Sequence, residues 1–520
     1  MHSRTGSANC YPRNERKPMI KTDFVILVTG KPDRLDETLA GISAEAKVGS
    51  GIVCVIDEAH RKSAGEIVER SKARVTAVYS DLSSEGAGSA LNKAISLTEG
   101  EAIFLITRMV TLLEGFVAAC ADKLFSSDSI GFVYASYIEE NGVDEESFVQ
   151  TRTDNYDFSE SSKIGPVRAV KREVFETVGY YDPSLKHAFD YDLRMRIFEE
   201  YELAALDGAA YRILHSGDDA NNHDPALPRS SYTSYTSEEE AEFRGACYAS
   251  LKRRGAFLTH APERAPEGDP EDPDGPEISV VIPLYNREKY IGRTIESVLQ
   301  SEWKRYEIII VDNGSTDAGF EAASKYTTSG DVTVLRCEVE RNTAAALNTG
   351  IRHARGKYIC QLDSDDLYAP DALSIMYNYM ESNPGYALGV SYYDWIGPDD
   401  RVLEEYGIVK HEEYDRNNIL RTEGVGAARI WRRSVLDEMG GFDETGLGSY
   451  AEDYDLVLRV SEKYDILRIP YVLYHYRINH KEDGEEADYV LRHEKKTRAR
   501  KSAILRRRVI NAGRKGEAAA

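Results

Sequence analysis

Three acidic side chains lie close together in Leu362-Asp363-Ser364-Asp365-Asp366, directly after a run of apolar residues. Two carboxylates separated by one residue on a loop offer the oxygen ligands that a hard divalent cation such as Mg²⁺ or Mn²⁺ prefers. One carboxylate can hold the metal on a diphosphate while the other binds a sugar hydroxyl. Alone, the segment is a weak signal, because acidic residues are common in turns and at helix starts.

A second acidic pair, Glu452-Asp453, opens a helical pattern that continues to Val460. A carboxylate at this position can act as a general base toward an acceptor hydroxyl, and it can also cap the helix. The two roles are compatible, and we predict the catalytic role for Asp453.

The chain carries one sequence pattern twice. Each half contains an Ala-Leu-Asn segment followed by a glycine and a short apolar run, at a constant offset of 348 − 92 = 256 residues. At this offset Asp363 corresponds to Thr107 and Asp365 to Met109. The first half has therefore lost the metal-binding pair, and we predict one active half and one inactive half.

The first half keeps two other acids, since Asp57 matches Asp312 and Asp190 matches Asp453. A lone base without a metal stabilises a diphosphate leaving group poorly. The inactive half is expected to serve packing or dimerisation, or to bind an acceptor glycan.

Both halves alternate apolar runs with amphipathic segments, which predicts an α/β fold with a mainly parallel sheet covered on both faces. Ligands of such sheets bind beyond the carboxyl ends of the strands, where Asp312 and Asp363 lie. The expected strands are 24–28, 52–56, 278–282, 307–311, 332–335 and 357–362, and the expected helices are 289–300 and 344–354.

Five ordered motifs across roughly residues 277 to 480 resemble the inverting nucleotide-sugar glycosyltransferases of family 2, which have the GT-A fold. The first half resembles a weaker, degenerate version, so the resemblance implies two tandem GT-A domains with Rossmann-like, mainly parallel sheets. The motifs are Val281-Ile282-Pro283-Leu284-Tyr285-Asn286, Ile310-Val311-Asp312-Asn313-Gly314-Ser315-Thr316-Asp317, Ala346-Leu347-Asn348-Thr349-Gly350, Leu362-Asp363-Ser364-Asp365-Asp366, and Gly440-Gly441-Phe442-Asp443 with Glu452-Asp453.

The resemblance implies a nucleotide site in which Asp312 hydrogen-bonds the base, most often uracil. Pro283, Tyr285 and Glu288 would line the nucleoside pocket, and Asp363 would reach the ribose or the donor sugar. One position departs from the family pattern: Asn342 stands where the family has Gly and the first half has Gly86. Asn tolerates left-handed backbone geometry, so we expect the turn to survive.

The resemblance also implies that Asp365 holds the divalent metal, Mn²⁺ or Mg²⁺, and that Asp453 is the general base. Some relatives place a His or an Arg on the metal or the diphosphate near the end of the matched region. Here the candidates are His480 for the metal, with His475 as an alternative, and Arg477 for the diphosphate.

Two further residues are expected near the acceptor or the donor sugar. Glu452 precedes the base, and Trp395 follows Tyr392 and Tyr393 in an aromatic group that either stacks on a sugar or fills the core.

The function implied is metal-dependent transfer of a sugar from a nucleoside diphosphate, a UDP-sugar, to a hydroxyl acceptor. The acceptor would be a glycan, a lipid-linked molecule or another hydroxyl compound of cell-surface polysaccharide or glycoconjugate synthesis. Two alternatives stay open. One is a glycan- or nucleotide-sugar-binding protein without turnover. The other is a sugar nucleotidyltransferase, which needs a glycine-rich phosphate loop that Leu284-Tyr285-Asn286-Arg287 does not provide.

Shifts in composition along the chain predict five segments. These are a disordered leader (1–19), a degenerate GT-A-like domain (20–254), an acidic Pro-rich linker (255–277), the catalytic domain (278–490) and a basic tail (491–520). The linker has nothing to bury and its prolines favour an extended form. The tail is expected as a solvated helix, or as a peripheral contact with an anionic membrane surface.

The formal net charge of −23 argues against nucleic acid as a partner, because an acidic surface repels phosphate backbones. The six cysteines form no CxxC pair and no apolar run reaches the length of a membrane span. We therefore expect a cytoplasmic protein, peripheral at the inner face of the membrane if the tail binds lipid. A homodimer is one expectation for the first half.

Overall fold

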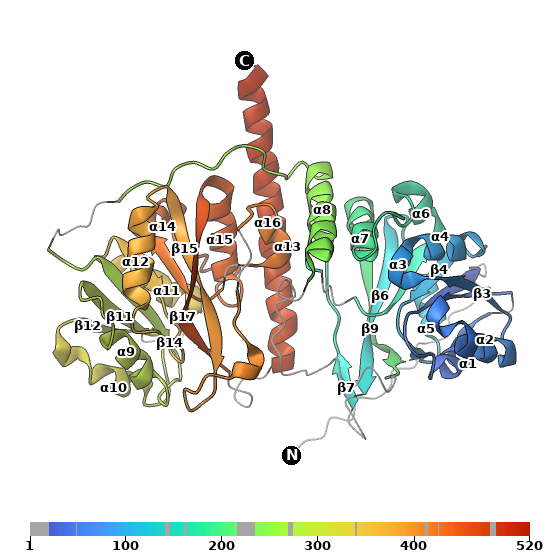
Figure 1. The fold of residues 1–520 in the computed structure, drawn as a ribbon, viewed down its shortest axis with the longest axis horizontal. Helices are drawn as coiled ribbons and strands as arrows, with labels where there is room; N and C mark the ends of the chain where they lie inside the picture. Colours follow the sequence, from blue (N-terminus) through green and yellow to red (C-terminus); the bar gives the residue numbers. More distant parts are fainter. Residues whose placement is uncertain are drawn as a thin grey trace. The chain divides into compact units, whose positions relative to one another are not determined.

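The computed structural model divides into two compact units, with the boundary between Ser250 and Leu251. Figure 1 shows one sheet in blue to cyan (unit 1) and one in olive to red (unit 2). The predicted leader, residues 1–19, lies outside the described residues. The structure describes residues 20–47, 49–140, 146–160, 164–215, 235–268, 274–337, 341–410, 414–424, 426–478 and 485–519.

Unit 2 contains a single mixed sheet with the strand order β12-β11-β10-β13-β16-β15-β17-β14. Neighbours pair in parallel at β12–β11, β11–β10, β10–β13 and β15–β17, and antiparallel elsewhere. The predicted α/β class with a mainly parallel sheet is confirmed. The strands are β10 (Ile278–Leu284), β11 (Tyr306–Asp312), β12 (Val332–Arg336), β13 (Tyr358–Gln361), β14 (Leu367–Tyr368), β15 (Tyr386–Ile396), β16 (Arg429–Arg432) and β17 (Asp465–Arg477).

Helices cover both faces of this sheet, as expected for strands such as β11 whose residues are all buried. On one face, α9 and α12 pack into the core that contains Val280 and Ile282. On the other face lies α11, where a Cβ on Gly350 would be 2.4 Å from Val281 Cγ1, so only glycine permits this approach. The helices are α9 (Ile291–Leu299), α10 (Gly319–Ser324), α11 (Thr343–His353), α12 (Ala372–Ser382), α13 (Ile419–Thr422), α14 (Arg433–Met439), α15 (Glu452–Lys463) and α16 (Glu485–Ala519).

Unit 1 has the same strand order, position by position: β3-β2-β1-β4-β8-β6-β9-β5, with β7 added beside β6. Its strands are β1 (Thr22–Val28), β2 (Ile52–Asp57), β3 (Val75–Ser80), β4 (Ala102–Ile106), β5 (Val110–Leu112), β6 (Ile130–Glu140), β7 (Glu146–Val149), β8 (Val167–Lys171) and β9 (Glu202–Ile213). Its helices are α1 (Leu35–Glu45), α2 (Arg61–Arg70), α3 (Leu82–Glu85), α4 (Gly88–Ser96), α5 (Phe116–Leu124), α6 (Arg172–Val178), α7 (Phe189–Glu200) and α8 (Ser237–Arg253), which crosses the unit boundary.

The repeated sequence motif corresponds to repeated contacts. Asn92 exchanges two hydrogen bonds with the backbone of Tyr181, and Asn348 exchanges the same two with Phe442. The repeated glycine is required in both units by a close backbone approach. A Cβ on Gly100 would lie 2.8 Å from a backbone nitrogen of β1, and one on Gly356 would lie 2.6 Å from a backbone nitrogen of β10.

The predicted linker, residues 255–277, is not a free spacer in its described part. Leu258 is buried and exchanges two hydrogen bonds with the Asn417 side chain. Ala265 is also buried and donates its N–H to the carbonyl of Gly385. The segment therefore binds along unit 2, which corrects the expectation that it has nothing to bury.

The basic tail is a packed helix and not a solvated one. In α16, Arg500 and Arg507 are fully buried together with Ala503 and Ile504. A buried guanidinium costs free energy unless it has hydrogen-bond or ion-pair partners. Arg507 donates to the carbonyl of Arg416, and Arg500 pairs with an acid of unit 2.

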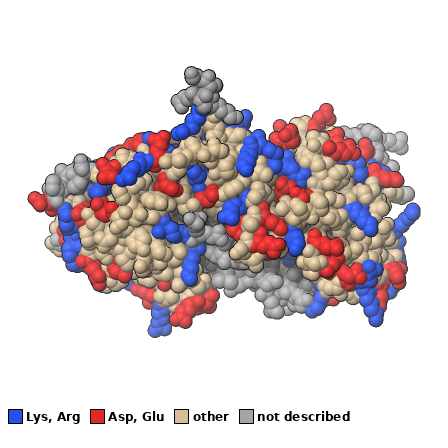
Figure 2. All heavy atoms as spheres, turned by 45° about the horizontal axis from the view of Figure 1, so that its top comes forward, with Lys and Arg blue, Asp and Glu red and all other residues tan. Residues whose placement is uncertain are grey.

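The acid that pairs with α16 is Glu423, which contacts Lys496 at 2.5 Å and also Arg500. Burial opposes ionisation of this carboxyl, but the two cations outweigh it and lower the pKa of Glu423 to about 2. Within the described ranges, no helix is both long and apolar enough to cross a bilayer. On the face in Figure 2, acidic and basic side chains are interspersed and form no broad field of one sign.

Replacing Glu423 with Gln should destabilise the protein in a pH-dependent way. A carboxyl whose pKa is lowered on folding contributes stability above its unfolded pKa and loses it as the pH falls toward the folded value. The drop from 4.5 to about 2 corresponds to roughly 3 kcal/mol. Denaturant unfolding should show this difference at pH 7 and about half of it at pH 3, whereas the exposed Glu405→Gln control should stay within about 0.5 kcal/mol of the parent. A difference that does not change with pH would contradict the ion-pair explanation.

Candidate active site

Two loops at the carboxyl edge of the unit 2 sheet are locked together. Asn286, with a left-handed φ of 52°, follows β10 and accepts a hydrogen bond from the Thr316 N–H at 2.8 Å, while its own N–H donates to Ser315 Oγ at 3.0 Å. The Glu288 N–H donates to the Asp317 carboxylate at 2.9 Å. The loop after β10 and the loop after β11 therefore form one rigid rim, which places the sequence-predicted Glu288 in the scaffold of the site.

Asp312 closes β11 beneath this rim and is completely buried. Its Oδ1 accepts the Ser315 N–H at 3.2 Å, whereas its Oδ2 accepts no hydrogen bond from any described residue and lies 3.4 Å from Arg336 Nε in an ion pair. A buried carboxylate oxygen with open acceptor capacity favours a ligand N–H. Tyr285, 38% exposed, and the half-buried Pro283 lie at the end of the adjacent strand β10.

The segment before α11 is fixed to the same rim. Asn313 exchanges hydrogen bonds with the backbone of Arg341 at 3.0 and 3.2 Å. The next residue, Asn342, has an ordinary extended backbone (φ −104°, ψ 169°) and caps α11 by accepting the Ala345 N–H. The expectation of left-handed geometry is wrong here: Gly86 has φ +72°, and the Asn side chain replaces that turn with a helix cap.

The three carboxylates of the acidic loop after β13 have different environments. Asp366 is buried and accepts the Tyr474 hydroxyl at 2.6 Å and the Arg477 N–H at 2.7 Å. Burial and then the neighbouring Asp365 raise the pKa of Asp366 well above its usual range. Asp366 therefore joins the acidic loop to the end of β17 and has no free face for a ligand.

Asp363 and Asp365 are the other two carboxylates of this loop, and both are half-buried. Asp365 pairs with Arg287 Nε at 3.0 Å, and both side chains keep some exposure. Burial and the Asp365 charge raise the pKa of Asp363 to about 6, although Arg429 opposes the shift. The charge of Asp365 raises the pKa of Asp363, and a divalent cation bound to both carboxylates would relieve this repulsion.

Asp363 and Asp365 offer carboxylate oxygens of the kind that a hard divalent cation prefers. Among the residues described, no three His, Cys, Asp or Glu side chains gather as a cation site. Two carboxylates still suffice for Mg²⁺ or Mn²⁺ when phosphate oxygens and waters complete the shell. His480 lies outside the described residues, and His475 Nδ1 is 2.6 Å from Asp394 Oδ1.

Arg477 holds the acidic loop in place through hydrogen bonds. Its side chain is fully buried, its Nε donates to the Asp365 carbonyl at 2.5 Å, and its terminal nitrogens contact the Gly397 carbonyl and Asp400. The guanidinium therefore has its acceptors within the protein, which corrects the expected diphosphate contact.

Trp395 likewise belongs to the core. It is 6% exposed and its ring packs edge-on against Tyr393 and Tyr476, with centroids 5.4 and 5.3 Å away. A ring packed on two sides has little surface left for stacking on a sugar, so the structure favours the core interpretation of this aromatic group.

Asp453 lies in the first turn of α15 and keeps 31% of its side chain exposed. Arg429 of β16 contacts its Oδ2 at 2.5 Å, and the Tyr454 N–H donates to its Oδ1 at 2.6 Å. Burial opposes ionisation, but the Arg429 charge holds the pKa of Asp453 below its usual value. The preceding Glu452 is buried, and burial together with Asp453 raises its pKa to about 8. Of the two acids, Asp453 is the ionised one.

Arg429 is the residue that motif reading missed. It is 6% exposed, and its second terminal nitrogen donates to Gln361 Oε1 on β13 at 3.2 Å. The repeat carried the signal, because Arg168 stands at the equivalent place in unit 1 and contacts Asp190 at 2.5 Å.

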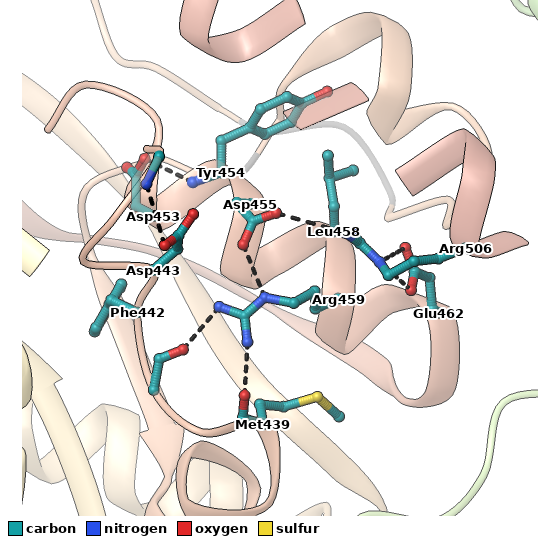
Figure 3. Close-up of polar contacts among 12 residues, drawn as sticks. Met439, Phe442, Asp443, Asp453, Tyr454, Asp455, Leu458, Arg459, Glu462 and Arg506 are labelled. Atoms are coloured by element: carbon teal, nitrogen blue, oxygen red, sulfur yellow. Dashed lines mark hydrogen bonds and ion pairs between the residues drawn. The ribbon is translucent and has the colours of Figure 1, made fainter. Parts of the chain in front are cut away.

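The helix that carries Asp453 is anchored at several points (Figure 3). Arg459 contacts Asp455 at 2.8 Å and donates to the carbonyls of Met439 and Gly441, both at 2.7 Å. These bonds tie the middle of α15 to the turn that follows α14. Unit 1 repeats the arrangement with Arg196.

Unit 1 lacks the acid pair in structure as well as in sequence. Met109 packs against the hydrophobic core, with its sulfur 3.8 Å from the Thr38 hydroxyl. Thr107 bonds through its N–H to the Pro166 carbonyl at 2.9 Å. Unit 1 thus keeps the Arg–Asp contact of the site without a carboxylate pair beside it.

Residues 279–440 match the family described as Glycosyl transferase family 2. The chain is 32% identical over 222 residues to an uncharacterized glycosyltransferase of Rickettsia conorii, a match that covers 40% of this chain and 37% of that protein. It is 30% identical over 190 residues to the chondroitin synthase of Escherichia coli, covering 36% and 27%. The chain thus spans well under half the length of these curated relatives. Among solved structures, TarS 1–349 of S. aureus in complex with UDP is 21% identical with a TM-score of 0.34, covering 42% of this chain and 64% of that one.

The different environments of Asp365 and Asp366 predict stability effects of very different size. Asp366→Ala should lower the free energy of unfolding by roughly 2–5 kcal/mol, because it leaves the Tyr474 hydroxyl and a backbone N–H buried without an acceptor. Asp365→Ala removes only a partly exposed ion pair and should change it by less than about 1 kcal/mol. Denaturant unfolding of both variants, with Asp366→Asn as the control that keeps an acceptor oxygen, tests this. Equal losses for Asp365→Ala and Asp366→Ala would contradict the assignment.

Proposed function

We propose that unit 2 is a metal-dependent, inverting glycosyltransferase that moves one sugar from a nucleoside diphosphate, a UDP-sugar, to a hydroxyl acceptor. One observation carries the proposal: the acids Asp312, Asp363, Asp365 and Asp453 meet at the carboxyl edge of one sheet, and each has an environment suited to a different task. The family 2 match over residues 279–440 supports the same reaction class.

Donor recognition is assigned to the first part of the unit. The open Oδ2 of Asp312 accepts an N–H of the base, and Tyr285 and Pro283 at the end of β10 flank the nucleoside. Asp363 accepts a hydroxyl of the ribose or of the donor sugar. When bound by Asp365 with Asp363, Mn²⁺ or Mg²⁺ neutralises charge on the diphosphate.

Asp453 is assigned as the general base. Its lowered pKa keeps it ionised near neutral pH, so it can take the proton of the acceptor hydroxyl as that oxygen attacks the anomeric carbon. Attack on the face opposite the diphosphate breaks the bond between the anomeric carbon and the diphosphate oxygen, releases the nucleoside diphosphate and inverts the configuration. Arg429 fixes the carboxylate in place and limits its basicity, and the buried Glu452 supports the start of the helix.

Unit 1 is proposed to be a degenerate copy that performs no chemistry of its own. The shared strand order and the repeated Asn and Arg–Asp contacts support common descent of the two units. Binding of an acceptor glycan or formation of a homodimer are the roles proposed for it. The similarity to a chondroitin synthase supports an acceptor in cell-surface polysaccharide or glycoconjugate synthesis.

The reaction is tested with a panel of nucleotide sugars and Mn²⁺, by measuring release of nucleoside diphosphate and transfer to an acceptor. The wild type should release UDP from one donor in a metal-dependent way. Asp365→Asn should lower the rate by at least about 10²-fold at unchanged thermal stability, because charge on the leaving group is no longer neutralised. Full activity of Asp365→Asn in the presence of a chelator would contradict the metal assignment, and binding of UDP without any turnover would favour the non-catalytic alternative.

The two equivalent acids distinguish the roles of the units. Asp453→Asn should slow transfer by about 10²-fold or more with little change in donor affinity, because a base acts mainly on the barrier. Asp190→Asn changes the same contact in unit 1 and should leave turnover nearly unchanged, at a stability cost of about 1 kcal/mol. Calorimetry with UDP checks binding separately. Inactivation of Asp190→Asn as severe as that of Asp453→Asn, in a folded protein, would show that both units are catalytic.

A further inference from the structure

The loop from Asp443 to Ala451 ends directly at the proposed base and lies beyond the family match, which stops at residue 440. On one side this loop makes hydrogen bonds with the start of α11. The Asn342 side chain donates to the Glu444 carbonyl at 2.6 Å, and the Ala344 N–H donates to the Gly448 carbonyl at 3.0 Å. This loop therefore connects the start of α11, which is fixed to the rim described above, with the proposed base Asp453.

On the other side the loop is held by α16. Lys495 Nζ donates to the Ser449 carbonyl at 2.9 Å, and its ammonium lies 5.6 Å from the centre of the Tyr450 ring. The Arg492 guanidinium lies 4.9 Å from the same ring. Two cations over one aromatic ring are attracted by its negative face, so both side chains bind the loop next to the base.

Tyr450 also has a strained backbone, with a φ of 74° that non-glycine residues rarely adopt. Such a conformation persists only when the surroundings impose it, and it is common at functional sites. Here Lys495 and Arg492 contact the ring, and Lys495 also holds the preceding carbonyl. The turn into Glu452 and Asp453 therefore depends on α16.

The helix can act as a rigid anchor because its inner side is buried. Arg492, Lys495 and Lys496 continue, at helical spacing, into the buried residues Arg500 and Ala503. The ion pairs of Lys496 and Arg500 with Glu423 described above fix the helix at this level. The position of the loop is thus set by a helix that lies about forty residues further along the chain than the base.

We propose that α16 is a positioning element of the transfer site, in which Arg492 and Lys495 hold Tyr450 and Ser449 and thereby fix the approach of Asp453 to the acceptor hydroxyl. The inference rests on the proposed function of unit 2. Neither cation touches the reacting atoms, so both are positioning residues. Displacement of a reacting group by about 1 Å can cost about 10²-fold in rate.

The test compares variants of the full chain. The double variant Arg492→Met/Lys495→Met removes both cations and should lower kcat about 10- to 100-fold at saturating acceptor, with the KM for the donor unchanged. Tyr450→Gly removes the ring but suits the left-handed backbone, so it should lose kcat too, whereas Tyr450→Phe keeps the ring and should retain it. The single variant Lys495→Met should also lower kcat, whereas the conservative variant Lys495→Arg should keep it close to the wild-type value. The matched control Arg514→Met, which removes another cation of α16 from its contact with Glu263, should leave kcat unchanged.

Hydrogen exchange of the amides from Glu444 to Ala451 gives a second measurement that needs no turnover. These amides should exchange faster in the double variant than in wild type or Arg514→Met. Unchanged exchange, or faster exchange with an unchanged kcat, overturns the proposal. A wild-type chain that transfers no sugar contradicts the proposed function instead, and the exchange measurement then decides by itself whether α16 holds the loop.

Discussion

The candidate site depends on one buried cation. Arg429 places a guanidinium between β13 and α15, where it contacts Asp453 and opposes the rise in the pKa of Asp363. Without a positive charge at this place, the carboxylates at the edge of the sheet would repel one another in a partly desolvated setting, and one or more would bind a proton. The guanidinium holds the pKa of Asp453 below its usual value, whereas burial and the Asp453 charge raise the pKa of the neighbouring Glu452.

The comparison of the two units separates architecture from chemistry. The contact of Arg168 with Asp190 persists in unit 1, although Thr107 and Met109 occupy the positions of the acid pair. Because this ion pair is present where the acid pair is missing, it also serves the fold by tying a helix start to the sheet. The same observation fits both roles of Asp453, the helix-start position that the structure shows and the base that we propose.

The C-terminal helix shows how a charged segment becomes part of a core. A basic stripe has a large cost of burial unless each cation meets an acceptor. Unit 2 supplies those acceptors with Glu423, Glu462 and backbone carbonyls, so that α16 binds closely beside α15. The same helix also contacts Ser449 and Tyr450 in the loop before Asp453, so a segment outside the family match lies against the candidate site.

By itself the sequence determined the class of fold, the buried strands and the acid pairs. Strands such as β11 are continuous apolar runs, and a repeat at constant offset shows which positions are shared. It also identified Asp312, Asp363, Asp365 and Asp453 as the acids to consider. These signals are local, or repeat at a fixed spacing, and so can be read along the chain.

Only the tertiary structure decided the partners. The acid loop contains three carboxylates in four residues, and nothing in their order tells that Asp366 faces Tyr474 while Asp365 faces Arg287. The sequence likewise did not predict three placements. Arg477 supports that loop, Trp395 lies in the core, and the basic tail packs against α15. Each depends on contacts between residues tens to more than one hundred positions apart, and the chemistry of a side chain alone does not specify which distant acceptor it will meet.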